Sequence, residues 1–174
     1  HKSANLLKNK DIQTMVGELS LNDRVPSFSL EATRINTCRD SDLLGQWTVL
    51  FIYPKDNTSG CTRETREFNE RYSDFESAGV RLFGVSKDTL ASHTSFSKKL
   101  NLQFPLISDP QTQLIQSLNA WKEKSMYGKK YMGTERSTFL IDKNLAVKYI
   151  WRKVKVGGHV NEVFDKCQEL MKDL

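Results

Sequence analysis

A chain of 174 residues with 38% hydrophobic side chains has the length and the apolar content of one compact domain. Its net charge of +5 comes from 26 basic residues scattered among 21 acidic ones, which argues against nucleic-acid binding. No apolar run approaches the roughly 20 residues that cross a bilayer, so we expect no membrane association. Three cysteines are too few for a disulfide framework and favour a reducing, cytoplasmic location.

The first 16 residues are interpreted differently from the rest of the chain. Because the first residue is His rather than Met, we interpret residues 1–16 as an N-terminal extension or a remnant of cloning. No repeat, low-complexity tract or Pro/Gly-rich linker interrupts the rest, so residues 17–174 are predicted to form a single domain.

The first predicted elements lead to a buried strand. Residues 28–33 alternate polar and apolar side chains before a turn at 34–37, which predicts a short strand or hairpin. Residues 47–53 (WTVLFIY) are a continuous β-branched and aromatic run, typical of a central parallel strand buried on both faces. Pro54 ends this strand, because proline cannot donate to a strand ladder, and residues 55–60 form a polar loop.

A helical pattern follows the loop, over residues 61–78. Phe68, Tyr72 and Phe75 recur at helical spacing, and Gly79 is expected to end the helix. The remaining predicted elements are strands at 80–85, 104–107, 137–141 and 146–151 and helices at 88–100, 112–118 and 159–172. Strands that alternate with helices before a closing hairpin and helix predict an α/β protein with a thioredoxin-like fold, in which helices flank a central mixed sheet.

Cys61 lies where the buried strand passes through the polar loop into the first turn of a helix. Unpaired backbone N–H groups and the positive end of the helix dipole favour an anion at this point. A cysteine there is therefore expected to carry more thiolate at neutral pH than a free thiol does. The other interpretation, a small apolar helix residue, suits an isolated cysteine better than one in this setting.

The segment around Cys61 resembles the peroxiredoxin signature PxxxTxxC, carried here by Pro54, Thr58 and Cys61. The resemblance is to the bacterioferritin-comigratory-protein group, or peroxiredoxin Q, and covers about residues 17–172. It runs through the segments VPSFSL, FIYPKDNTSGCTRE, FPLISD, MYGKKYMG and ERSTFLID. The resemblance implies an antioxidant thiol peroxidase that reduces hydrogen peroxide and organic hydroperoxides through a sulfenic acid at Cys61, without a cofactor and as a monomer.

The resemblance also implies roles for residues around this cysteine. Thr58 would supply a hydroxyl that accepts from the peroxide or donates to sulfur. Arg136 would stabilise the thiolate and the departing oxygen, since a guanidinium keeps its proton and offers several donors in one plane. Pro54 would shield the sulfur from water.

Two further residues are predicted beside the substrate. The backbone N–H groups near Gly60 and Cys61 would hold the peroxide oxygens. Glu64, three residues beyond the cysteine, either orients Arg136 or is an ordinary first-turn acid that complements the helix dipole.

A sulfenic acid must condense with a thiol before further peroxide oxidises it irreversibly. Members of the group place the resolving cysteine five residues after the first one or in the next helix, and these positions are Arg66 and Ser97 here. Either the protein lacks a resolving cysteine, or Ser97 is an engineered substitution. The residues around Ser97 resemble the subgroup that uses this helix, which slightly favours the second interpretation. Cys38 and Cys167 are predicted to be structural, although resolution through either stays open. In each case a thioredoxin- or glutathione/glutaredoxin-type reductant would return the thiol.

Two other functions compete with peroxide reduction. A thioredoxin-like disulfide oxidoreductase shares the fold but needs a second cysteine beside the first, and no CxxC surrounds Cys61. A non-catalytic binding module would have no need to keep Pro54, Thr58, Cys61 and Arg136 together.

The remaining polar features have simpler interpretations. No Cys/His spacing suits zinc, so no metal site is expected, and His93 and His159 are interpreted as surface or capping residues. The densest basic cluster, at 122–130, is interpreted as a solvated face.

Overall fold

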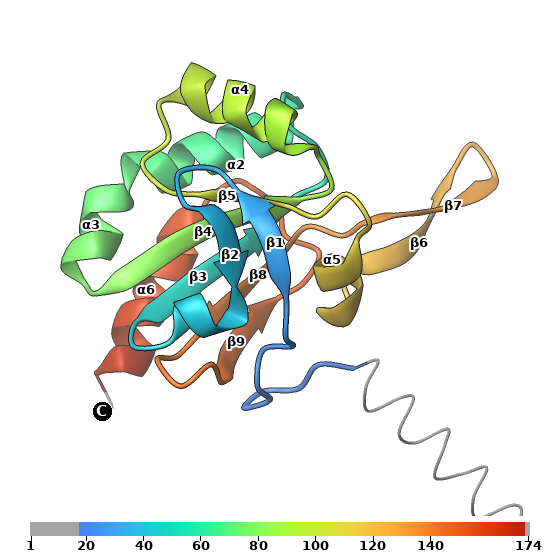
Figure 1. Ribbon diagram of the computed structural model, residues 1–174. Helices are drawn as coiled ribbons and strands as arrows, with labels where there is room; N and C mark the ends of the chain where they lie inside the picture. Colours follow the sequence, from blue (N-terminus) through green and yellow to red (C-terminus); the bar gives the residue numbers. More distant parts are fainter. Residues whose placement is uncertain (1–17, 173–174) are drawn as a thin grey trace, which may run out of the picture.

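The computed structural model describes residues 18–172, and a seven-stranded mixed sheet forms its centre (Figure 1). The strand order is β2-β1-β5-β4-β3-β8-β9, and a separate two-stranded sheet, β6-β7, projects from the body (Figure 1). The strands are β1 (Ser29–Ala32), β2 (Asn36–Arg39), β3 (Trp47–Ile52), β4 (Val80–Ser86), β5 (Leu106–Ser108), β6 (Trp121–Met126), β7 (Lys129–Thr134), β8 (Ser137–Ile141) and β9 (Val147–Trp151). The helices are η1 (Asp40–Leu43), α2 (Ser59–Glu70), α3 (Tyr72–Ser77), α4 (Leu90–Leu100), α5 (Gln113–Ser117) and α6 (His159–Met171).

β3 is an inner strand of the sheet, between β4 and β8, and all of its residues are buried. It pairs in parallel with β4 and antiparallel with β8. The continuous apolar run therefore has the predicted cause, burial on both faces, but only one of its two neighbours is parallel. The predicted thioredoxin-like fold with a central mixed sheet is confirmed.

Each face of the sheet has its own apolar core. On one face Val49 and Phe51 pack with residues of α2, α3, α4 and α6, among them Phe68, Phe75 and Phe96. On the other face the alternate residues of β3 pack with α5 and the N-terminal segments. Successive side chains of a strand point to opposite faces, so one strand supplies both cores.

The helix that follows the loop between β3 and α2 differs from its prediction in two ways. It begins at Ser59 instead of Cys61, because Thr58 is the extended N-cap residue. It also breaks at Arg71, whose φ of −97° and ψ of 8° end α2 before α3 begins. Gly79 follows α3 with a φ of +80°, the left-handed conformation that a glycine adopts without a Cβ penalty.

Most of the other predicted elements lie within about two residues of the observed ones, but the sequence pattern missed the short helix η1 and placed a turn where β2 begins. It also missed the hairpin of β6 and β7. Its residues, WKEKSM and KKYMGT, are lysine-rich and mostly exposed, so they lack the apolar alternation of a half-buried strand. None of the helices among residues 18–172 is long and apolar enough to cross a bilayer. The predicted extension at 1–16 lies outside the described residues.

Candidate active site

The loop between β3 and α2 places Cys61 in the first turn of a helix. Thr58 is the N-cap residue, and the helix backbone closes with a bond from the Thr62 N–H to the Thr58 carbonyl. The Thr58 hydroxyl donates to the Lys55 carbonyl at 2.9 Å and does not cap the helix. The first-turn N–H groups therefore remain available to an oxygen that approaches the cysteine.

Arg136 reaches this cysteine from a distant part of the chain. It immediately precedes β8, and the β3–β8 register sets Ser137 opposite Ile52, at the end of β3 that leads into the loop. Its Nη2 donates to Cys61 Sγ at 3.3 Å, and its Nη1 donates to Glu64 Oε1 at 2.7 Å. One guanidinium thus joins the sulfur to a carboxylate on the same helix.

Burial affects the pKa values of Glu64 and Arg136. Glu64 is fully buried, and burial raises its pKa to about 7 although Arg136 acts to lower it. Its second oxygen, Oε2, is buried without a hydrogen-bond partner in residues 18–172. Burial alone would lower the pKa of Arg136, but Glu64 and Cys61 outweigh it and raise that pKa, so the guanidinium stays charged.

Gly60 allows the guanidinium to approach the backbone. A Cβ at this position would lie 3.2 Å from Arg136 Nη2, which is closer than most side-chain contacts. The sequence-predicted residues Cys61, Gly60, Glu64 and Arg136 are therefore brought together in one place, and Pro54 lies half-buried in the loop before them.

The prediction of a surface or capping role for His159 is wrong, because its side chain is buried under the same site. His159 Nε2 lies 2.8 Å from the Thr138 hydroxyl. Burial, and secondarily the charge of Arg136, lower its pKa to about 4, so it is neutral at neutral pH. The start of a helix is usually exposed, but α6 begins against the sheet.

The same prediction is wrong for His93, which is completely buried and holds the active-site loop. Its Nδ1 lies 2.8 Å from Asp56 Oδ2, and its Nε2 lies 3.0 Å from the Ile107 carbonyl. Asp56 also accepts from the Tyr53 hydroxyl at 2.7 Å and from Ser92 Oγ at 2.8 Å. Both ring nitrogens of His93 therefore lie within hydrogen-bond distance of an oxygen atom. Sequence reasoning missed this network, and the signal available was an acid in the loop and a histidine in α4.

Asp88 completes the network by accepting from the backbone N–H of Asp56 at 2.9 Å and from Ser86 Oγ. Oxygen and nitrogen atoms of Asp56, Asp88 and His93 lie within 4.8 Å of one another, a spacing that a metal ion could use. Their hydrogen bonds to one another and to Tyr53 already occupy these atoms. The arrangement serves to tie the loop to α4.

The candidate resolving positions and the two other cysteines make no hydrogen bond to Cys61, Glu64 or Arg136 among the described residues. Arg66 is exposed on α2, and Ser97 is half-buried on α4 beside a depression of about 420 Å³. No hydrogen bond in the described range links either of them to Cys61. Cys38 and Cys167 are buried free thiols, and burial raises the pKa of each to about 12.

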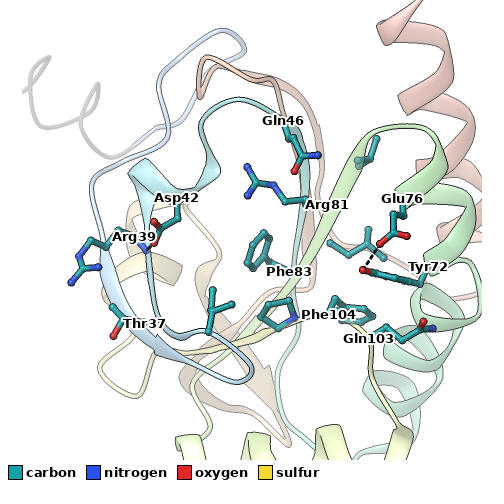
Figure 2. Close-up of a pocket in the computed structure, with 14 residues that line it drawn as sticks. Thr37, Arg39, Asp42, Gln46, Tyr72, Glu76, Arg81, Phe83, Gln103 and Phe104 are labelled. Carbon is teal, nitrogen blue, oxygen red and sulfur yellow. Dashed lines mark hydrogen bonds between the residues drawn. The ribbon is translucent and has the colours of Figure 1, made fainter.

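A cavity at the opposite end of the sheet is lined by none of the predicted site residues. It has a volume of about 610 Å³ and lies over the start of β4, whereas Cys61 follows the end of the parallel strand β3. Figure 2 shows Phe83 and Phe104 between a wall that carries Arg39 and one that carries Tyr72. We therefore locate the chemistry from the hydrogen bonds of Cys61 and not from cavity size.

A thioredoxin-like domain that holds an arginine-bonded cysteine in the first turn of a helix defines a thiol-dependent redox protein. Residues 21–150 match the model of the AhpC/TSA family. Peroxiredoxin Bcp of Bacillus subtilis is 38% identical over 152 residues, which are 87% of this chain and 97% of the relative. Peroxiredoxin Bcp of Xanthomonas campestris is 46% identical over 119 residues, which are 68% of this chain and 74% of the relative.

Solved structures of the same group share the fold. The bacterioferritin comigratory protein of Xanthomonas campestris superposes with a TM-score of 0.79 at 39% identity, over 82% of this chain and 90% of that chain. A cysteine-to-serine mutant of Xylella fastidiosa PrxQ superposes with a TM-score of 0.83 at 37% identity, over 88% and 98%. The chain belongs to the AhpC/TSA family, within its Bcp peroxiredoxins, and is a thiol peroxidase. The resemblance stated from the sequence is confirmed.

Proposed function

We propose that Cys61 is the thiol that reduces hydroperoxides, and that its bond from Arg136 is the observation that carries this assignment. The thiolate attacks one oxygen of the peroxide, an S–O bond forms and the O–O bond breaks. The second oxygen leaves as hydroxide or alkoxide and takes up a proton to give water or an alcohol. Cys61 is left as a sulfenic acid.

Arg136 acts on both ends of this displacement. In the resting site its Nη2 donates to the sulfur, and during attack its N–H groups face the oxygen that gains charge. Glu64 holds the guanidinium from the other side and is a positioning residue. The charge is therefore placed before the peroxide arrives, which avoids the cost of moving it during the reaction.

Residues of the loop and of the first turn of α2 complete the proposed site. Thr58 and the N–H groups of Gly60 and Cys61 contact the peroxide oxygens, and Pro54 limits the access of water to the sulfur. This is supported by the uncapped first turn of α2 and by the burial of Cys61, which is 1% exposed.

The proposed substrates are hydrogen peroxide and organic hydroperoxides. The solved structure of the Xanthomonas campestris relative is described in terms of alkyl peroxide reduction activity. The same displacement serves both, because only the leaving oxygen differs.

The proposed recycling uses an external thiol. Solved mutants of Xanthomonas campestris peroxiredoxin Q carry serine at either of two cysteines, which lie as far apart in that chain as Cys61 and Ser97 do here. Ser97 cannot form a disulfide, and Cys38 and Cys167 are buried with raised pKa values. We therefore assign reduction of the sulfenic acid to a thioredoxin- or glutathione/glutaredoxin-type reductant, acting on a monomer in the cytoplasm.

Peroxide consumption by the wild type and by Cys61→Ser tests the proposal. The wild type should consume peroxide in stopped-flow measurements, and the variant should not. Intact mass after one equivalent of peroxide should show a gain of one oxygen. Loss of two hydrogens would instead mean that an internal disulfide forms, and equal consumption by the variant would remove Cys61 from the chemistry.

A further inference from the structure

The hairpin of β6 and β7 exposes several large apolar side chains in one place. Tyr127 is 97% exposed, and Met126, Tyr131 and Met132 are 43–56% exposed. The other large apolar side chains exposed among residues 18–172 are scattered single residues of the N-terminal segments, namely Leu21, Ile35 and Leu44. Clustered tyrosine and methionine on a projecting element are typical of a protein–protein contact (Figure 1).

The turn of this hairpin presents its tyrosine at a conformational cost. Tyr127 has a φ of +52° and Gly128 a φ of +77°, the left-handed pair of a tight hairpin turn. Asn or Gly usually occupies the first of these positions, because a bulky side chain is disfavoured at positive φ. An aromatic residue kept in such a conformation indicates a function for the side chain at the tip.

One face of the hairpin is positively charged without acidic residues. The register pairs Lys122 with Gly133, Lys124 with Tyr131, and Met126 with Lys129, and these pairs share a face. That face therefore carries three lysines beside exposed tyrosine and methionine. The only carboxylate of the hairpin, Glu123, lies on the other face and pairs with Lys130. A partner for the basic face needs an acidic surface.

Reduction of the proposed sulfenic acid takes two thiols, and one dithiol protein can supply both. The first thiol condenses with the Cys61 sulfenic acid, which forms a mixed disulfide and releases water. A second thiolate of the partner then attacks the partner's own sulfur, which leaves the partner oxidised to a disulfide and returns the Cys61 thiolate. Cys38 and Cys167 cannot supply this thiol, because both are buried with a pKa of about 12.

The base of the hairpin lies next to the catalytic arginine. β7 ends at Thr134, and only Glu135 lies between it and Arg136, so the Cα atoms of Thr134 and Arg136 are at most about 7 Å apart. We propose that the hairpin is the docking surface for an acidic dithiol protein that reduces Cys61 directly, an inference that rests on the proposed function. A second copy of this chain does not fit the basic face, because two such faces would repel each other.

Charge reversal on the hairpin tests this docking role. Peroxide turnover is measured with two reductants: a thioredoxin of negative net charge, kept reduced by NADPH and its reductase, and dithiothreitol. Lys122→Glu/Lys129→Glu should raise the KM for thioredoxin about tenfold or more. The same variant should keep its rate with dithiothreitol within about twofold, because a small dithiol needs no docking surface.

The matched control is Lys143→Glu/Lys172→Glu, which makes the same charge change at exposed positions away from the hairpin. It should leave both rates unchanged. A second variant, Tyr127→Asn, suits the left-handed turn and should raise hairpin stability while it weakens turnover with thioredoxin, an opposition that a purely structural role would not produce.

Three results would overturn the docking role. The first is a hairpin variant with the wild-type KM for thioredoxin, and the second is an equal loss with dithiothreitol. The third is a wild type that dithiothreitol recycles but thioredoxin does not. Failure of the proposed function is distinguishable from all three, because the wild type itself would then consume no peroxide with either reductant.

Discussion

At the scale of single residues, the site depends on a guanidinium held between a sulfur and a carboxylate. Arg136 has its two terminal nitrogens engaged by Cys61 and Glu64, and its side chain is only 16% exposed. Its direction is therefore set before a peroxide enters. Preorganised charge of this kind accounts for much of the rate enhancement in many enzymes.

Replacement of this arginine should abolish most of the peroxide reactivity. Arg136→Met keeps a long side chain but removes the donors, so the second-order rate of sulfenic acid formation should fall about a hundredfold or more. Stopped-flow kinetics measure this rate. The control is Arg152→Met, since Arg152 is half-buried but bonds only to the Asn119 carbonyl. Retention of the rate within about twofold by Arg136→Met would contradict the assigned role.

Glu64 should make the stability of the protein depend on pH. Burial raises its pKa from 4.5 to about 7, so the unfolded chain ionises it first as pH rises. The stability that the protonated carboxyl provides is complete below pH 4.5 and is lost by about pH 7, a change on the order of 3 kcal/mol.

Comparison with Glu64→Gln measures this effect. Urea unfolding from pH 4.5 to 8 should show the wild type losing stability relative to the variant as pH rises, because Gln does not titrate. A stability difference that stays constant over this range would mean that Glu64 ionises in the folded protein as it does in the unfolded chain.

At the scale of elements, the active-site loop is held by α4. Asp56 accepts from Tyr53, Ser92 and His93, and its backbone N–H donates to Asp88. The loop that carries Pro54 and Thr58 therefore has its geometry set by a helix that contributes no reacting atom. The hydrogen bonds of this network satisfy polar groups that are buried beside the apolar core.

Two substitutions at Asp56 should separate the charge of its carboxylate from its hydrogen bonds. Asp56→Ala leaves Tyr53 and His93 buried without their hydrogen-bond partner and should reduce the free energy of unfolding by about 3–5 kcal/mol. Asp56→Asn can accept from Tyr53 and donate to a neutral His93, so it should cost much less. Urea denaturation measures both, and equal losses in the two variants would show that the hydrogen bonds do not carry the stability.

At the scale of the whole molecule, the three buried cysteines are divided between the two cores, with Cys61 and Cys167 in one and Cys38 in the other. Cys38 packs on one face of the sheet and Cys167 on the other, and both are 0% exposed. Cys61 lies where the sheet, α2 and the chain before β8 meet. Burial alone does not distinguish the three thiols, but Arg136 donates to Cys61, so we expect Cys61 to be the reactive one.

Alkylation of the native protein should reveal the difference in reactivity between the three thiols. Iodoacetamide should modify Cys61 in the native state and all three thiols in urea, because burial raises the pKa of Cys38 and Cys167 to about 12. Mass spectrometry of tryptic peptides identifies the modified sites. Modification of Cys38 or Cys167 in the native protein at a rate close to that of Cys61 would contradict the picture.

The amino-acid sequence by itself determined most of the strands and helices, the buried strand β3 and the cysteine at the start of a helix, but not the β6–β7 hairpin or the break between α2 and α3. These follow from local periodicity and from the turn chemistry of neighbouring residues, such as Pro54 and Gly79. The role of Arg136 could be named only by resemblance, because 75 residues separate it from Cys61.

Only the tertiary structure decided which of these groups meet. The β3–β8 register brings Arg136 to the sulfur, and the packing of α4 and α6 on the sheet buries His93 and His159. The physical reason is that contacts between distant segments depend on strand register and on the face to which a side chain points, and neither leaves a periodic signal within one segment.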